Sequence, residues 1–376
     1  MNPSIKNRLI YRLIESESVK KRFRRIDTLF YRMDVRRRFD YDNSRLSRLP
    51  QEDLTDDEYE RAKKLWPLFC LDSFKFYKAF CGYFDEHFVP NDYYDMAEHV
   101  FNLRWASYFL QHKCNLKYVV PSTYRPESIL QKIDGHYVFE DNREISESEA
   151  RGILLDFPQF VRKVALGTGG GRGVMKVVWS EVEDKKSALD ELLKGNDIIF
   201  QKVIEQDDFI AQFNPDSVNT YRLLTLNING CCTVLSSFLR MGAKGSFVDN
   251  LCSGGGVLVG INSEGEINDF GVNKEYKKIY QAPTGLKFKG IGIPNWQRVK
   301  ESVVDYHRNI PQANLIGWDI AIDKNGTPIV VEINLDSAAV EAHQIFNGPV
   351  FGERFDEVRD YIRNRIPMLR HSMITY

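Results

Sequence analysis

The sequence predicts an α+β protein in which a helical N-terminal region precedes a region of mixed strands and helices. Aromatic side chains recur at helical spacing between Thr55 and His112, which indicates packed helices there. After residue 113, short apolar runs bounded by glycines alternate with short helical patterns. Near the C-terminus, Asn325-Gly326 joins two alternating apolar runs, and this dipeptide is the strongest short-range signal for a β-hairpin.

The composition is that of an ordinary globular protein, with 376 residues of which 43% are hydrophobic and 27% are charged. Such a chain can bury a sizeable core and is expected to form two or three lobes. Its six cysteines show no C-x-x-C spacing, so neither a metal cluster nor a disulfide framework is predicted. No apolar run reaches the roughly 18 residues of a membrane span, and the N-terminus lacks the apolar core of a signal peptide. We therefore expect a cytoplasmic protein.

Residues 1–48 are strongly basic, with 14 Lys and Arg against 6 Asp and Glu, whereas the whole chain has a net charge of −1. Between residues 4 and 38 the pattern is that of an amphipathic helix with an arginine-rich polar face. Three interpretations stay open: the helix lies on an anionic membrane at its inner face, binds a partner protein, or docks on its own domain. Nothing else in the chain supports binding to nucleic acid.

The remaining elements follow in order. Thr55 is a good N-cap for the helical block that runs to His112. The patterns beyond it predict strands at 115–121, 136–139, 160–164, 174–179, 198–204, 220–228, 231–240, 256–262 and 266–271, and helices at 126–133, 185–194, 296–310 and 352–365. We expect three regions: a basic helical region (1–112), a lobe that contains a glycine-rich loop (113–204), and a C-terminal lobe that contains the hairpin (205–376).

A glycine-rich loop joins two of these strands, and its residues are Gly167, Thr168, Gly169, Gly170, Gly171, Arg172 and Gly173. Glycines let successive backbone N–H groups approach an anion, so the loop is suited to phosphate, with Lys163 one strand upstream. The loop leads into a strand rather than a helix, which excludes a Walker A loop and the Rossmann fingerprint. Asp269-Phe270-Gly271 matches a kinase tripeptide, but no H-R-D segment precedes it. The pattern favours a flap that folds over a triphosphate.

The C-terminal hairpin places three polar residues on one face. With a two-residue turn, Lys324 pairs with Thr327, and counting back sets Asp319 opposite Glu332. Asn334 shares their face because side chains alternate along a strand. Two carboxylates about 5 Å apart repel by about 3 kcal/mol at an effective dielectric constant near 20. We therefore expect an exposed face whose carboxylates share a cation, and this all-oxygen set suits Mg²⁺.

Several of these segments together resemble the ATP-grasp superfamily. They are K-V-A-L-G-T-G-G-G-R-G-V from Lys163, Q-K-V-I from Gln201, and the D…E-x-N arrangement that ends at Asn334. NTYRLLTL, FLRMG, VDNLCSGGG and GWD are similar to the sugar-transfer-associated ATP-grasp family, as are LTDDEYERAKKLW and VPSTYRPE upstream. The resemblance implies the ATP-grasp fold, in which two α+β lobes clamp ATP, and a role in making surface polysaccharide such as capsule.

The resemblance also implies roles for individual residues. Lys163 would meet the α-phosphate, and the glycine loop would cover the β- and γ-phosphates. Adenine would lie against the hinge formed by Gln201, Lys202, Val203 and Ile204, and Mg²⁺ would be held by Asp319, Glu332 and Asn334. Arg222, Arg240 and Asn250 would lie beside the reacting acyl phosphate. D-alanine–D-alanine ligases carry an arginine two residues before the metal aspartate, where this chain has Gly317, so Arg240 or Arg222 is expected to replace it.

The expected function is that of a Mg-ATP-dependent carboxylate–amine ligase that acts on a small-molecule or glycan-precursor substrate. Two alternatives stay open: a kinase for a sugar or small acid, and a non-catalytic nucleotide-binding component of a glycan-assembly complex, whose enzymes the basic N-terminus would contact. His343 is interpreted as structural, because a lone histidine near a C-terminal helix more often packs than reacts.

Overall fold

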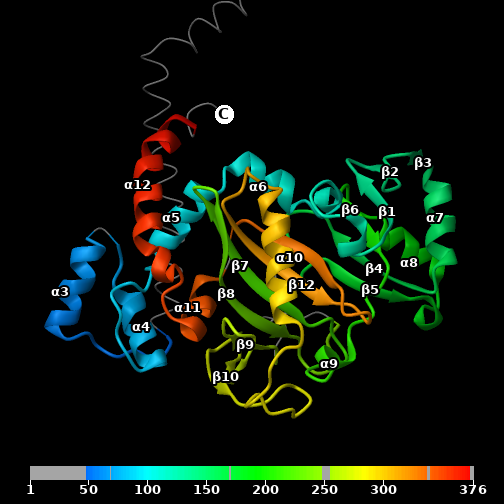
Figure 1. The fold of residues 1–376 in the computed structure, drawn as a ribbon. Coiled ribbons are helices and arrows are strands. Elements are labelled where there is room, and N and C mark those ends of the chain that lie inside the picture. Colours follow the sequence, from blue (N-terminus) through cyan, green and yellow to red (C-terminus); the bar gives the residue numbers. More distant parts are fainter. Residues whose placement is uncertain (1–47, 68, 169–170, 248–254, 337–338, 373–376) are drawn as a thin grey trace, which may run out of the picture. The chain divides into compact units, whose positions relative to one another are not determined.

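The computed structural model describes residues 48–372 except 68, 169–170, 248–254 and 337–338 (Figure 1). The basic helix expected at 4–38 therefore lies outside the described residues, as do Gly169, Gly170 and Asn250. The described chain forms two compact units. None of its helices has the length and apolar character needed to cross a membrane.

The smaller unit comprises residues up to 86, residues 90–93, and the chain from 356 onward. It contains α3 (Asp56–Leu65), α4 (Asp72–Cys81) and nearly all of α12 (Phe355–Ser372). The predicted N-cap is confirmed, because Thr55 accepts a hydrogen bond from the Glu58 N–H while the Glu58 carboxylate accepts one from the Thr55 N–H. The rings of Trp66, Phe69 and Tyr93 pack edge to face in its core. Of the aromatic residues whose helical spacing predicted a core, Phe74, Tyr77, Phe80 and Phe101 are buried, whereas Trp105 and Phe109 are 57% and 48% exposed, so the prediction is wrong for these two.

The larger unit comprises residues 87–89 and 94–355 and contains two antiparallel sheets. The first has the strand order β3-β2-β1-β6-β4-β5. Its strands are β1 (Ser128–Ile133), β2 (His136–Val138), β3 (Glu144–Ile145), β4 (Gln159–Val164), β5 (Val174–Val178) and β6 (Ile198–Gln201). Apolar side chains of α7 (Glu147–Asp156) and α8 (Lys185–Leu192) pack on it in one core with Phe160 and Phe200. The glycine-rich loop connects β4 to β5, as expected for a flap.

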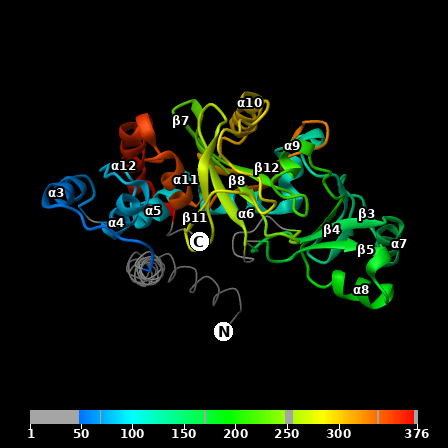
Figure 2. The same ribbon diagram turned by 90° about the horizontal axis from the view of Figure 1, so that it is seen from below.

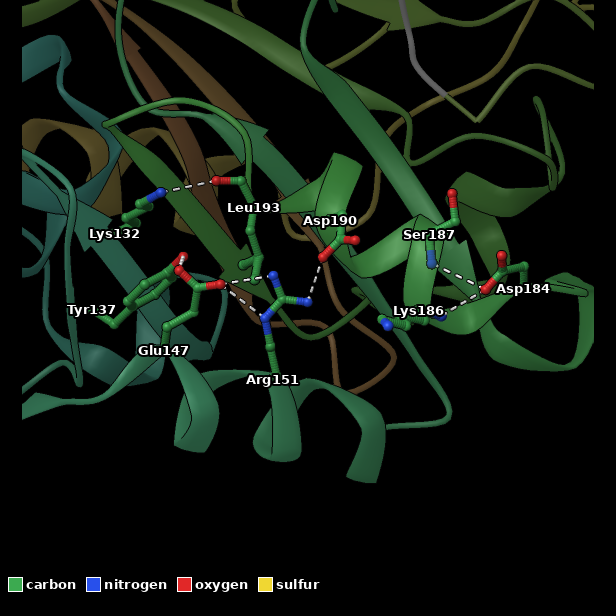
Figure 3. Close-up of polar contacts among 9 residues, drawn as sticks. All are labelled: Lys132, Tyr137, Glu147, Arg151, Asp184, Lys186, Ser187, Asp190 and Leu193. Carbon is green, nitrogen blue, oxygen red and sulfur yellow. Dashed lines mark hydrogen bonds and ion pairs between the residues drawn. The ribbon is translucent and has the colours of Figure 1, made fainter.

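Polar contacts on this lobe hold its two helices together (Figure 3). Arg151 on α7 lies 2.7 Å from Glu147 on its own helix and 2.7 Å from Asp190 on α8. Asp184 caps α8 by accepting hydrogen bonds from the backbone N–H groups of Lys186 and Ser187. Because the carboxylates that face Arg151 are exposed, these ion pairs contribute little to stability.

The second sheet has the order β11-β10-β9-β8-β7-β12-β13. Its strands are β7 (Thr220–Ile228), β8 (Cys231–Met241), β9 (Val257–Ile261), β10 (Ile267–Val272), β11 (Lys278–Ile279), β12 (Leu315–Ile322) and β13 (Pro328–Asn334). α10 (Trp296–Arg308) packs on it, and Figure 1 shows this helix in front of the sheet, between the labelled strands β7 and β12. This unit also contains α9 (Asp208–Ala211), α11 (Val340–Asn347), α6 (Arg104–Gln111), most of α5 (Asn91–Phe101) and short 3₁₀ turns. Figure 2 shows α11 and α10 beside the sheet from below.

Two predicted elements are wrong. Residues 115–121 are not a strand, because the chain forms a 3₁₀ helix over Lys113–Tyr118 that buries Cys114 and Leu116. Residues 126–133 are not a helix, because Ser128–Ile133 is strand β1. β1 lies between β2 and β6 and pairs with both, so pairing with residues about 70 positions away overrides the local pattern.

A buried histidine connects α10 to the sheet. The His307 ring is fully buried, with Nδ1 2.6 Å from Thr225 Oγ1 and Nε2 3.0 Å from the Ala313 carbonyl oxygen. The Trp318 indole N–H donates to the same Thr225 hydroxyl at 2.8 Å. Burial lowers the pKa of His307 from 6.5 to about 4.

We expect this histidine to make folding stability depend on pH. Between about pH 6.5 and pH 4 the unfolded chain binds a proton that the folded chain excludes, so stability falls as the pH drops through this window, by up to about 3 kcal/mol. The unfolding midpoint measured near pH 7 and near pH 5 should drop more in the parent protein than in His307→Asn. His136→Asn, at an exposed position, is the control and should keep the parent's dependence. If the unfolding midpoint falls equally between pH 7 and pH 5 in all three proteins, His307 is not the cause of the pH dependence.

Candidate nucleotide and metal site

A cavity of about 250 Å³ in the larger unit is lined by residues of both sheets. It contains most of the residues that the sequence singled out. Those lining it are Lys163, Thr168, Gly171, Arg172, Gln201, Lys202, Ile204, Arg222, Arg240, Asp319, Glu332 and Asn334. Gly167, Gly173 and Val203 do not line it.

A buried aspartate in the cavity lining is held by two arginines. Arg222 Nε lies 2.6 Å from Asp319 Oδ1, and Arg222 Nη2 lies 3.1 Å from Oδ2. Arg240 Nη1 lies 2.8 Å from the same Oδ2. This contact arises because β7 sets Arg222 directly opposite Asp319, and β8 is the next strand. Burial alone would raise the pKa of Asp319, but the charges and hydrogen bonds of the two arginines lower it well below its usual value.

The hairpin register is confirmed, since Asp319 lies opposite Glu332 and Gly317 opposite Asn334. The predicted turn is wrong. Asp323, not Lys324, lies opposite Thr327, and its N–H donates to the Thr327 carbonyl. The turn is therefore a three-residue loop that ends at Gly326 (φ 74°). A β-bulge after Asp319 restores the predicted register closer to the site. The turn and the bulge each shift the pairing by one residue, and their effects cancel.

The expectation of an exposed pair of repelling carboxylates is wrong. Asp319 is only 4% exposed and is neutralised by the two arginines. Glu332 pairs separately with Lys113, whose Nζ lies 2.9 Å from Oε1. Each carboxylate is therefore already neutralised by its own basic partners. Repulsion between Asp319 and Glu332 is not a reason for a metal ion to bind here.

The residues nevertheless fit a magnesium ion. Glu332 is partly exposed to the cavity, and Asn334 lies beside Asp319, with its Nδ2 3.4 Å from Asp319 Oδ2. Two carboxylates and a carboxamide offer the hard oxygen ligands that Mg²⁺ takes in proteins. Three donors surround Asp319 Oδ2, whereas Oδ1 has one, so Oδ1 has the greater capacity to ligate an ion.

The charge of the lining suits a polyphosphate. Six cationic side chains line the cavity (Lys113, Lys163, Arg172, Lys202, Arg222 and Arg240) against two carboxylates, which leaves a net charge of +4. Triphosphates carry a comparable negative charge near neutral pH, and oppositely charged walls of low polarisability strengthen the attraction. The cavity therefore favours an anion of high charge.

The glycine loop meets the cavity through Thr168, Gly171 and Arg172. Gly171 has φ 75°, a left-handed conformation that glycine adopts without strain. Gly173 also has φ 75°, but a Cβ there would lie 2.8 Å from Val164 Cγ2, so its role is in packing. Lys163 on β4 is 9% exposed and reaches the same cavity.

Gln201, the last residue of β6, presents a polar group to the cavity. Gln201 is 5% exposed, and its Oε1 is buried with no hydrogen-bond partner among the described residues. Burying such an oxygen unpaired costs about 1–3 kcal/mol, which a bound donor would recover. The Lys202 N–H already donates to the Glu127 carbonyl, so it does not serve a ligand in this conformation.

Gly317 lies beside the side chain of Arg222. A Cβ at this position would lie 3.6 Å from Arg222 Cδ and 3.5 Å from Asn334 Cβ. The arginine stem on β7 thus passes beside Gly317, and a guanidinium reaches Asp319 from the neighbouring strand. Arg222 and Arg240, which the sequence suggested as replacements for the ligases' arginine, both contact Asp319, and their role in the reaction stays a prediction.

Some lining residues were missed from the sequence. Lys113, in the 3₁₀ helix, belongs to no motif, and its partner Glu332 lies over 200 residues away. Phe247 and Val331 add apolar surface to the cavity lining, and no sequence motif identifies them. His343 lies elsewhere: its ring is buried, with Nδ1 2.9 Å from Ser236 Oγ, in agreement with the structural interpretation.

Residues 131–360 match the family model described as sugar-transfer associated ATP-grasp. The chain therefore has the ATP-grasp fold, and it belongs to the sugar-transfer associated ATP-grasp family.

Solved structures of ATP-grasp ligases are similar to the chain at low identity. The D-alanine–D-alanine ligase from Coxiella burnetii is 11% identical, with 71% of this chain and 61% of that chain covered and a TM-score of 0.39. The ATP-grasp ligase PsnB complexed with a minimal precursor is 13% identical, with coverages of 69% and 64% and a TM-score of 0.39. D-alanine–D-alanine ligase from Bacillus anthracis is 14% identical, with coverages of 72% and 72% and a TM-score of 0.40. The chain thus spans less than two thirds of the length of the first two, and no curated protein matches its sequence.

Proposed function

We propose that this protein is a Mg-ATP-dependent ligase that joins a carboxylate to an amine through an acyl phosphate. The observation that supports this most directly is the Arg222–Asp319–Arg240 cluster, in one cavity with Glu332 and Lys163. The family's description and the ligase activities named for similar structures agree with it.

The nucleotide would extend across the cavity. Its adenine would lie at the hinge, where the Gln201 Oε1 accepts a hydrogen bond from the exocyclic amine. Lys163 would contact the α-phosphate, and the loop around Gly171 would cover the β- and γ-phosphates. The γ-phosphate would then face Arg222 and Arg240.

The reaction needs phosphoryl transfer because a carboxylate is a poor electrophile. A carboxylate oxygen of the substrate attacks the γ-phosphorus, the bond to the ADP oxygen breaks, and the acyl phosphate forms. An amine then attacks the acyl carbon and phosphate leaves, so that an amide, ADP and phosphate are the products. Arg222 and Arg240 would stabilise the negative charge on the transferring group and on the tetrahedral oxyanion. Mg²⁺ held by Asp319, Glu332 and Asn334 would supply further charge neutralisation on the phosphates.

The substrate is proposed to be a sugar or glycan precursor of capsule or other surface polysaccharide, since the family is described as associated with sugar transfer. Enzymes of glycan assembly are the proposed partners. Uronic acids suit the carboxylate role because they combine a sugar ring with a carboxylate.

The decisive experiment measures ADP release against panels of uronic acids, sugar nucleotides and amino acids, with mass spectrometry of the products. An amide product with stoichiometric ADP and phosphate is expected. ADP with a phosphorylated acceptor and no amide would assign a kinase instead. Nucleotide binding without turnover on any panel member would assign a binding component.

The flap is tested by Gly171→Val. A β-branched side chain resists the left-handed backbone and blocks approach to phosphate, so the KM for ATP should rise about tenfold or more. The control is Gly135→Val, since Gly135 has φ 86° in the β1–β2 turn and lies away from the cavity. Both variants should lose similar stability, whereas only Gly171→Val should change the KM. An unchanged KM for ATP in Gly171→Val would show that the loop only connects β4 to β5.

A further inference from the structure

A buried asparagine ties together the two strands that carry the candidate metal ligands. Asn102 directly follows α5 and is 2% exposed. Its Nδ2 donates to the Leu315 carbonyl at 2.6 Å and to the Leu335 carbonyl at 2.7 Å. Its Oδ1 accepts from the N–H groups of Asn314 and Leu315, at 3.0 and 3.2 Å. A carboxamide has two donor hydrogens and two acceptor lone pairs, so this side chain uses all four.

Leu335 is the residue at which the chain leaves the sheet. The pairing of β12 with β13 ends at Gly317 and Asn334, so Leu335 lies beyond the ladder. It is 2% exposed, and buried backbone groups need hydrogen-bond partners. Asn102 provides the partner for its carbonyl, and Gln111 Oε1, at the end of α6, accepts from its N–H at 3.4 Å. We call Asn102 and Gln111 the Leu335 clamp.

The Leu335 clamp acts beside a candidate metal ligand. Asn334 is the last residue of β13, which is an edge strand of its sheet. Its Nδ2 lies 3.3 Å from the Gly317 carbonyl oxygen and 3.4 Å from Asp319 Oδ2. Because Nδ2 is turned toward these two acceptors, Oδ1 is the atom that can ligate a cation. The end of an edge strand frays unless the chain beyond it is held, and the clamp holds it here.

Magnesium makes the position of this oxygen critical. Mg²⁺ requires near-octahedral geometry with ligand distances of about 2.0–2.1 Å. Groups of a binding site must therefore be held to within about 0.5 Å of their working positions. Residues that orient a metal ligand from behind typically change metal affinity by about 10–100-fold when they are replaced.

We propose that the Leu335 clamp positions Asn334 to ligate Mg²⁺. Asn102 and Gln111 are positioning residues, since neither lines the cavity and both act through the backbone of Leu335. This inference rests on the proposed function, because it assumes that Asn334 takes part in a magnesium site. It adds that the segment from α5 to α6, which belongs to none of the sequence motifs described above, sets the geometry of that site.

The test measures binding of ADP rather than turnover. The dissociation constant of ADP is measured by calorimetry on the full-length protein, once with Mg²⁺ and once with EDTA. The constant in EDTA divided by the constant in Mg²⁺ isolates the contribution of the metal, and we expect this magnesium ratio to exceed one in the parent. Asn102→Ala should lower the ratio about tenfold, or to one where the parental ratio is below ten.

A second variant releases the other half of the clamp. Gln111 is half-buried, and its hydrogen bond to the Leu335 N–H is the longer of the two, so Gln111→Ala should disturb the fold less. It should lower the magnesium ratio about threefold. If Asn102→Ala does not fold, this variant decides alone.

The matched control deletes a buried carboxamide far along the chain. Gln344 is 0% exposed, does not line the cavity, and makes three hydrogen bonds with the backbone of Val89 and Val350. Gln344→Ala, like Asn102→Ala, leaves buried backbone groups without their partners, so both variants should have a lower unfolding midpoint. Only Asn102→Ala should have a lower magnesium ratio.

Each contrary outcome has a separate meaning. A parental magnesium ratio in Asn102→Ala and Gln111→Ala would overturn the inference and leave the proposed function standing. An equal fall in Gln344→Ala would assign the effect to general loss of stability, which also overturns it. A parent protein that binds ADP equally well in Mg²⁺ and in EDTA would contradict the magnesium site itself, and with it the proposed function.

Discussion

The Asp319→Asn variant is expected to unfold with a free energy about 3–5 kcal/mol below that of the parent protein. Asp319 is 4% exposed and is the shared counterion of Arg222 and Arg240, whose side chains are 8% and 15% exposed. Asparagine keeps the shape but removes the charge, so two buried guanidinium groups lose their compensation. The expectation from the sequence, that this change would spare the fold, assumed an exposed face and does not hold for this aspartate.

The measurement is denaturant unfolding followed by circular dichroism. The matched control is Asp305→Asn, because Asp305 also pairs with an arginine, Arg308, but at the surface, with both side chains more than 60% exposed. Its loss should be within about 1 kcal/mol. Equal stabilities of Asp319→Asn and Asp305→Asn would show that the arginines do not depend on Asp319.

Glu332→Gln is expected to lower turnover by about 10²–10³-fold while leaving the unfolding midpoint nearly unchanged. Glu332 is 30% exposed and pairs with Lys113, and glutamine keeps an oxygen acceptor for that ammonium, so the cost in stability stays small. In the proposed reaction it is a metal ligand, and glutamine is a much poorer ligand for Mg²⁺. The variant should also need a higher magnesium concentration for half-maximal ADP release.

The control for this second variant is Glu301→Gln, on the exposed side of α10. It should retain parental turnover and magnesium dependence. A Glu332→Gln protein with parental kinetics would place the metal ligands elsewhere. A large loss of stability would mean instead that the Lys113 pair holds the 3₁₀ helix in place.

The sequence by itself determined the fold class, the family and the order of most elements. Strong local signals made this possible: the Thr55 capping box, the glycine-rich loop between two strands, and the alternation that sets Asp319 opposite Glu332. Alternation has a period of two, so these residues share a face wherever the strands pair in this register. The register was right although the turn was not, because the bulge compensated for the longer loop.

Only the tertiary structure decided the electrostatics of the site. Arg222 and Asp319 are 97 positions apart, and Lys113 and Glu332 more than 200, so no local pattern pairs them. The same holds for β1, whose strand conformation depends on pairing with β6. Sheet pairing and ion pairing are contacts between distant segments, and their energies exceed local preferences by several-fold in the buried interior. For this reason the sequence located the carboxylates, whereas their burial and their partners followed from the fold.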